Sequence, residues 1–121
     1  MTAKILVVED DPTNRKMLKD VLNYYGYEVL EAKNGKEGIS MAREHIPQVI
    51  LMDIEMPVMD GVEATKVLKA DPQTKDLKII SLTGYDVSAD TREFRGVVFD
   101  DTISKPIDIR QLPSMMKKHL S

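Results

Sequence analysis

The sequence predicts an α/β domain in which a parallel sheet lies between two layers of helices. Two observations support this fold class. Short apolar segments alternate strictly with segments of helical period, five of each, and crossover helices between successive strands give a parallel sheet covered on both faces. Three of the strand segments are near-continuous apolar runs, as is usual for strands buried on both faces. The 121 residues, 42% of them hydrophobic, fit a single domain over residues 1–121.

The first four predicted elements are two strands and two helices. The run KILVVE predicts a strand at residues 4–9, and the alternating run YEVLEA predicts another at 27–32. A helix between them is expected over residues 12–26, where Gly26 is a typical stop. Its apolar positions share one face: Leu18, Val21, Leu22 and Tyr25. A second helix is expected over residues 34–45, with the asparagine at its start as a cap.

The remaining six elements continue the alternation. The run at residues 48–52 predicts a third, fully buried strand. The others are a helix at 61–70, a strand at 77–83, a short and weakly patterned helix at 88–94, a strand at 97–104 and a helix at 108–120. Pro113 falls inside the last segment, where it would remove a hydrogen bond, so this helix is expected to start late or to kink.

Composition excludes several classes of protein. The net charge of −3 and the absence of a clustered basic segment argue against a nucleic-acid-binding domain. No cysteine is present, so there is no disulfide framework. The N-terminus reaches acidic residues after only a few apolar ones, which resembles neither a signal peptide nor a membrane span. The expected location is therefore the cytoplasm.

Polar residues follow the predicted strands at the edge where their carboxyl ends meet. The first strand ends in Glu9 and Asp10, the third in Asp53, the fourth in Thr83, and the fifth is followed by Lys105. In an open parallel sheet the ligand site lies at this edge. Carboxylates packed this closely repel one another unless a cation lies between them. A hard divalent ion of the magnesium type fits such oxygen ligands, and the lysine can balance a carboxylate or a phosphoryl oxygen.

Four motifs, KILVVEDD, VILMDIEMPVMDG, IISLTG and TISKPID, together resemble the receiver domains of two-component response regulators. The resemblance covers essentially the whole chain. It implies a flavodoxin-like, doubly wound sheet of five parallel strands in the order 2-1-3-4-5, flanked by five helices. It also implies a stand-alone receiver without an output domain, a signalling protein rather than an enzyme that acts on other substrates.

The resemblance further implies a phosphorylation site. Asp53 would accept a phosphoryl group from a phosphohistidine on a sensor kinase or a phosphotransfer protein. The reaction would need Mg²⁺, for which Mn²⁺ could substitute. The implied metal ligands are Asp10, Asp53 and the backbone carbonyl of Glu55, with Glu9 as an acidic partner in the outer coordination sphere.

The remaining implied roles concern the phosphoryl group and switching. Thr83 would hydrogen-bond the phosphoryl group and Lys105 would pair with it, while Glu55 and Tyr85 lie at positions that tune its hydrolysis. Thr102 occupies the switch position on the fifth strand, where receivers often carry Tyr or Phe. The usual aromatic switch is therefore missing.

Partners and alternatives complete the prediction. A downstream protein is expected to bind the face formed by the fourth helix, fifth strand and fifth helix of a monomer, without nucleic acid or membrane insertion. A phosphatase that forms an aspartyl-phosphate is one alternative, although its motif requires a second Asp where this chain has Glu55. The stronger alternative is a degenerate receiver that binds partners without being phosphorylated, because Thr102 weakens the switch.

Overall fold

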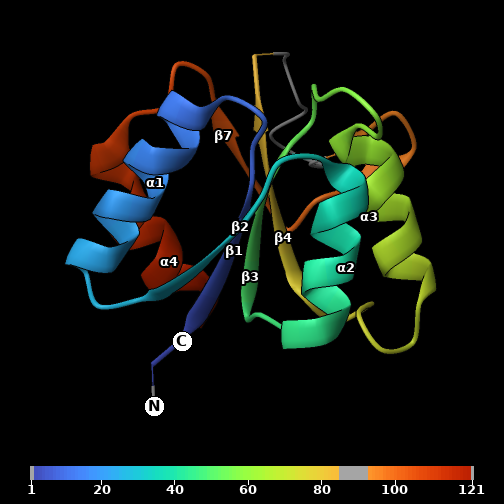
Figure 1. Ribbon diagram of the computed structural model, residues 1–121, viewed down its shortest axis with the longest axis horizontal. Coiled ribbons are helices and arrows are strands. Elements are labelled where there is room, and N and C mark those ends of the chain that lie inside the picture. Colours follow the sequence, from blue (N-terminus) through green and yellow to red (C-terminus); the bar gives the residue numbers. More distant parts are fainter. Residues whose placement is uncertain (1, 85–92, 121) are drawn as a thin grey trace.

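The computed structural model describes residues 2–84 and 93–120. Its main feature is a twisted sheet of five parallel strands in the order β2-β1-β3-β4-β7 (Figure 1). The strands are β1 (Lys4–Val8), β2 (Glu28–Ala32), β3 (Val49–Asp53), β4 (Lys78–Thr83) and β7 (Asp101–Ser104). Because β7 is the fifth strand of this sheet along the chain, the predicted fold class and strand order are confirmed.

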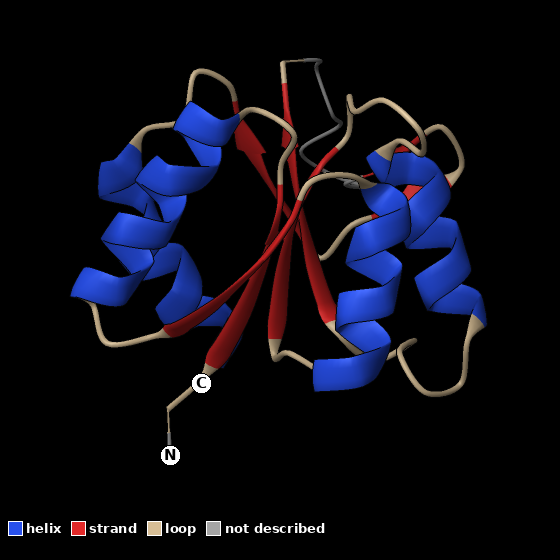
Figure 2. Cartoon of the chain, in the orientation of Figure 1, coloured by secondary structure: helices blue, strands red, loops and turns tan. Residues whose placement is uncertain are grey.

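Two pairs of helices cover the two faces of the sheet (Figure 2). One face carries α1 (Pro12–Tyr24) and α4 (Leu112–Leu120), and the other carries α2 (Gly35–His45) and α3 (Gly61–Ala70). A short 3₁₀ turn, η1 (Ile109–Gln111), precedes α4. Alternate residues of the buried strands contribute to the two cores, with Leu51 in one and Ile50 in the other. Both faces are therefore apolar, which explains the continuous apolar run in β3.

Short polar side chains fix the starts of the helices. Asp11 accepts a hydrogen bond from the Thr13 amide at the start of α1. Asn34, the predicted cap of α2, accepts from the Glu37 amide at 2.9 Å. Asp60 caps α3 in the same way. These caps satisfy amides that have no partner within the helix, and they set where each helix starts relative to the strand before it.

The segment between β4 and β7 differs from the prediction. Most of the helix expected at 88–94 lies outside the described residues, but its last two residues form a strand, β5 (Glu93–Phe94), which pairs antiparallel with β6 (Val97–Val98). The strand expected at 97–104 is divided into β6 and β7, since Phe99 and Asp100 leave the ladder. Within the described residues the sheet is therefore flanked by four α-helices and η1, not by the five predicted helices.

The helices on the α1 and α4 face also depart from their expected limits. The last helix starts late, as predicted, because Pro113 is the second residue of α4, where no amide donor is required. In α1, Leu18 and Leu22 are buried as expected, but Tyr25 lies after the helix and is exposed. Among the described residues, no helix combines the length and apolar character needed to cross a membrane.

Strands β2 and β7 form the two edges of the sheet. On β7, the Asp101 carboxylate accepts a hydrogen bond from the neighbouring Thr102 amide at 2.9 Å. The same carboxylate contacts His119 Nε2 at 2.9 Å and Lys118 Nζ at 3.2 Å, both on α4. Asp101 therefore connects the edge strand to the last helix of the domain.

Candidate functional site

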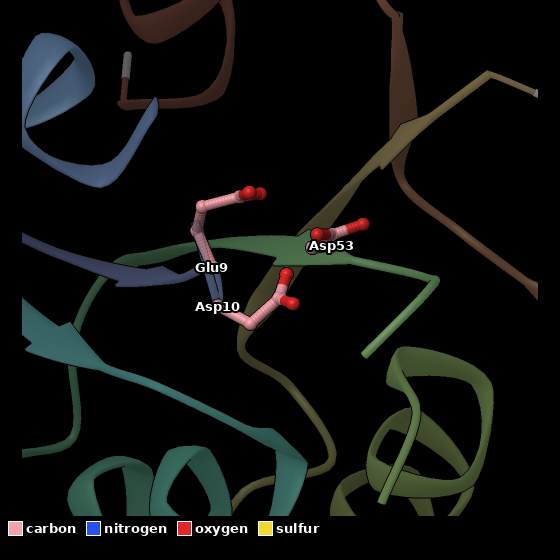
Figure 3. A group of neighbouring side chains, drawn as sticks. All are labelled: Glu9, Asp10 and Asp53. Carbon is pink, nitrogen blue, oxygen red and sulfur yellow. The ribbon is translucent and has the colours of Figure 1, made fainter. Parts of the chain in front are cut away.

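Three carboxylates meet where the carboxyl ends of β1 and β3 lie side by side (Figure 3). Glu9 and Asp10 follow β1, and Asp53 is the last residue of β3. Each offers an oxygen within 4.8 Å of the others. The acidic site, as we name this group of three residues, is the cluster that the sequence predicted.

Asp53 is buried although it carries an ionisable group, with only 1% of its surface exposed. Its Oδ1 accepts a hydrogen bond from the Glu55 amide at 3.1 Å and lies 3.0 Å from Lys105 Nζ. Its Oδ2 has no hydrogen-bond partner within the described part of the chain. Gly61 packs so closely against the backbone of Asp53 that a Cβ atom at position 61 would clash with it. Because glycine has no Cβ atom, α3 can start beside the Asp53 carboxylate.

Glu9 is equally buried and lies in the loop between β1 and α1. Its Oε1 accepts long hydrogen bonds from the Asp11 amide at 3.3 Å and from Asn14 Nδ2 at 3.4 Å. Its Oε2 lies 3.6 Å from Lys105 Nζ and has no hydrogen-bond partner among the described residues. Asp10, by contrast, is exposed. Two buried carboxylate oxygens are therefore left without a donor, which is costly unless a cation is bound nearby.

Lys105 supplies positive charge to the acidic site from the loop after β7. Its amide donates to the Thr83 carbonyl at 2.8 Å, which fixes the start of that loop beside β4. Burial alone would lower the pKa of Lys105, but its hydrogen bond to Asp53 and the surrounding carboxylates raise it above its usual value. The lysine is therefore fully protonated at neutral pH.

One ammonium does not balance three carboxylates. Burial, followed by the nearby Glu9 carboxyl group, raises the pKa of Asp53 to about 6, although Lys105 acts in the opposite direction. Asp10 is exposed as a residue, but partial desolvation of its carboxyl group, followed by the proximity of Asp53, raises its pKa. A divalent cation would remove this repulsion. The oxygen donors and the two unpartnered carboxylate oxygens fit a magnesium-type ion.

The other predicted site residues have different environments. Thr83 ends β4, with 1% of its surface exposed, and pairs in register with Ser104. Glu55 is exposed two residues beyond Asp53. Tyr85 lies outside the described residues. The metal-binding role of the Glu55 carbonyl and the roles in hydrolysis remain predictions.

Thr102, at the predicted switch position, forms a contact that the sequence did not suggest. Ser81 Oγ of β4 lies 2.7 Å from Thr102 Oγ1 of β7 in a partly buried hydrogen bond between paired residues. The Thr102 side chain is thus hydrogen-bonded to the neighbouring strand, β4.

Sequence reasoning also missed two residues on the first turn of α1. Asn14 contacts the Glu9 carboxylate, and Arg15 Nη1 donates to the Glu9 backbone carbonyl at 2.8 Å. The sequence does place Asn14 and Arg15 five and six residues after Glu9, in the first helical turn after the loop.

Comparisons with known proteins agree with this geometry. The family model of the response regulator receiver domain matches residues 5–117. The polar-differentiation response regulator DivK of Brucella ovis is 35% identical over 120 residues, which cover 99% of this chain and 98% of that protein.

Solved structures give the same result. The chemotaxis protein CheY4 of Vibrio cholerae superposes with a TM-score of 0.88 at 30% identity and covers 98% of this chain and 99% of its own. The receiver domain of the sensor histidine kinase PA1611 of Pseudomonas aeruginosa, solved with a magnesium ion in its active-site cleft, has a TM-score of 0.87 at 28% identity over 98% of both chains. On the family model, the relatives and the fold together, this chain belongs to the family of response regulator receiver domains.

Proposed function

We propose that this chain, acting in the cytoplasm as one receiver domain over residues 1–121, accepts a phosphoryl group on Asp53. The donor is a phosphohistidine of a sensor kinase or phosphotransfer protein, and the reaction requires Mg²⁺. The observation that supports this most strongly is the acidic site, in which buried Asp53 lies 3.0 Å from Lys105 and two carboxylate oxygens have no donor among residues 2–84 and 93–120. The alternative of a degenerate receiver gains no support, because the acceptor, the acidic pair and the lysine are all present.

The proposed reaction transfers a phosphoryl group from a histidine nitrogen of the donor to a carboxylate oxygen of Asp53. An oxygen of Asp53 forms a bond to phosphorus as the bond between phosphorus and the histidine nitrogen breaks, and the electron pair of that bond returns to the imidazole. Magnesium, when bound, neutralises charge on the transferring group, and Mn²⁺ can take its place. Lys105 attracts a phosphoryl oxygen as a point charge. The Glu55 amide orients the acceptor carboxylate.

Five residues besides Asp53 and Lys105 would act on the bound ion and the phosphoryl group. Asp10 and the Glu55 carbonyl join Asp53 as metal ligands, with Glu9 in the outer coordination sphere. Thr83 donates its hydroxyl to the phosphoryl group from the end of β4. Glu55, with Tyr85, sets the rate of hydrolysis.

Signalling then passes to a downstream protein through a surface of the monomer. Receiver domains interact with kinases or phosphotransfer proteins and with downstream partners. In this chain we propose that the downstream partner binds the face of the predicted fourth helix, fifth strand and fifth helix. Most of that fourth helix lies outside the described residues, and the described part of the face is β7 and α4, where a groove of about 620 Å³ is lined by Thr102, Gln111 and Lys118 among others. Thr102 would act as the atypical switch through its bond to Ser81 rather than through an aromatic rotation.

Intact-mass spectrometry tests the proposed reaction. We expect the purified chain to gain the mass of one phosphoryl group when incubated with acetyl phosphate and Mg²⁺. EDTA and the Asp53→Asn variant should each prevent the gain, whereas Asp60→Asn, which removes a nearby helix-capping charge, should not. Equal labelling of the Asp53→Asn variant, or equal labelling with EDTA, would refute the proposal. Transfer from phosphorylated candidate kinases would then identify the donor.

A further inference from the structure

Glu9 is fixed at both its backbone and its side chain. The Glu9 amide donates to the Ala32 carbonyl of β2 at 3.1 Å, and the Glu9 carbonyl accepts from Arg15 Nη1 at 2.8 Å. Among the described residues, hydrogen bonds reach only one carboxylate oxygen, Oε1, from Asn14 and from the Asp11 amide. The other oxygen, Oε2, is left on the side of Lys105, whose Nζ lies 3.6 Å away.

Arg15 is itself anchored. Its Nε lies 3.4 Å from an oxygen of Glu31 on β2, and Lys19 Nζ lies 3.2 Å from the other oxygen of the same carboxylate. Only 17% of the Arg15 side chain is exposed. One guanidinium thus connects β2 and α1 to Glu9, the residue that follows β1. Because Asp10 follows Glu9 directly, a fixed Glu9 carbonyl also fixes the backbone from which Asp10 extends.

A glutamate at this position needs such support. Its side chain has one more rotatable bond than that of aspartate, so an unsupported carboxylate can turn and exchange its two oxygens. Contacts from Asn14 and the Asp11 amide to Oε1 remove this freedom. Neighbours that orient a metal-binding group commonly change metal affinity when they are mutated.

We propose that Arg15 and Asn14 are positioning residues of the acidic site. Arg15 holds the Glu9 backbone, and Asn14 turns the Glu9 carboxylate so that Oε2 faces Asp53 and Lys105. This inference rests on the proposed function, since it concerns the same metal and phosphoryl site.

Magnesium binding, measured by isothermal titration calorimetry, gives a readout that is independent of phosphorylation. Arg15→Lys keeps the charge but loses the fork that reaches Glu9 and Glu31 together, and it should weaken Mg²⁺ binding on the order of tenfold. Lys19→Met is the matched control, because it removes a cation from the same Glu31 carboxylate without touching Glu9. It should bind Mg²⁺ as the unmodified chain does. Thermal melts establish that each variant is folded, and Arg15→Gln replaces any variant that is not.

A double-mutant cycle tests whether Asn14 acts through Glu9. Asn14→Ala should weaken Mg²⁺ binding in the unmodified chain, but it should have no effect in the Glu9→Asp background, where the shorter carboxylate no longer reaches position 14. A purely structural role for Asn14 would give the same loss in both backgrounds.

The outcomes separate the two proposals. If the unmodified chain binds no Mg²⁺, the proposed metal-dependent function fails. If it binds Mg²⁺ but Arg15→Lys binds equally well, or Asn14→Ala has the same effect in both backgrounds, the positioning roles are wrong and the proposed function stands.

Discussion

The ionised carboxylate of Asp53 is needed for the proposed reaction, but its burial destabilises the metal-free fold. In the metal-free protein its carboxylate is buried beside two others, and its pKa is raised to about 6 from the usual 3.8 of an aspartate. A raised pKa means that the folded state binds the proton more tightly than the unfolded chain. The stability contributed by protonation is therefore fully present below about pH 4 and is lost as the pH rises through about 6.

The first prediction follows from this loss of stability with rising pH. Asp53→Asn, which is neutral at every pH, should increase the free energy of unfolding by about 1–3 kcal/mol more at pH 7.5 than at pH 4.5. The measurement is urea unfolding at both pH values in the presence of EDTA.

Asp60→Asn is the control for this prediction, because asparagine caps a helix as well as aspartate does. The change that Asp60→Asn makes in the free energy of unfolding should not grow between pH 4.5 and pH 7.5. An Asp53→Asn variant less stable than the unmodified chain at pH 7.5 would show that the carboxylate stabilises the metal-free fold.

Site residues were predictable where backbone topology alone places them. Glu9, Asp53 and Thr83 follow or end parallel strands, so the fold brings them to one edge whatever their side-chain conformation. Arg15 and Asn14 were missed because their roles depend on how far a side chain reaches from α1 back to the loop. No periodicity in the sequence reports such a contact.

At the scale of the elements, the pairing of β4 with β7 contains a polar pair in a largely apolar sheet. Ser81 is fully buried and donates to half-buried Thr102 at 2.7 Å. Opposed hydroxyls of this kind stabilise a strand pair only while both are present, because a buried donor without an acceptor is destabilising.

The second prediction is a coupling between these strands. Thr102→Val should lower the free energy of unfolding by about 1–3 kcal/mol, because Ser81 loses its acceptor. The Ser81→Ala and Thr102→Val double variant should lose less than the sum of the single losses. Urea unfolding of the three variants measures the coupling. Ser104→Ala, on the exposed part of β7, should change stability by less than about 0.5 kcal/mol. Additive losses would mean that the two hydroxyls act independently.

The hairpin of β5 and β6 explains why the predicted helix at 88–94 was wrong at its end. Arg95 and Gly96 both have positive φ, 52° and 81°, as a two-residue hairpin turn of the favoured hand requires. Phe94 and Val97 pair across it. The signal was a glycine between Phe94 and the pair Val97–Val98, but so short a hairpin has too few residues to show an alternating pattern.

At the scale of the whole molecule, the acidic site should couple metal binding to global stability. A ligand that binds only the folded state stabilises it by mass action, by about 2.7 kcal/mol at a hundredfold excess over its dissociation constant. The third prediction is that Mg²⁺ raises the thermal midpoint in a saturable way and that Asp10→Asn loses most of this increase.

Asp11→Asn controls for the loss of charge in the same loop. It removes a carboxylate one residue away and keeps a residue that can cap α1. Its midpoint should rise with Mg²⁺ as that of the unmodified chain does. An equal increase in the Asp10→Asn variant would mean that Mg²⁺ stabilises the domain elsewhere.

The contact between Asp101 and the Thr102 amide has a consequence for how copies of this chain behave at high concentration. An open sheet offers the main-chain groups of its edge strands to any other strand it meets, and this is a route to aggregation. On β7, one of the amide hydrogens is already taken by a carboxylate on the same strand. A second chain would have to displace this bond and approach a negative charge, so the fold protects its own edge against strand addition.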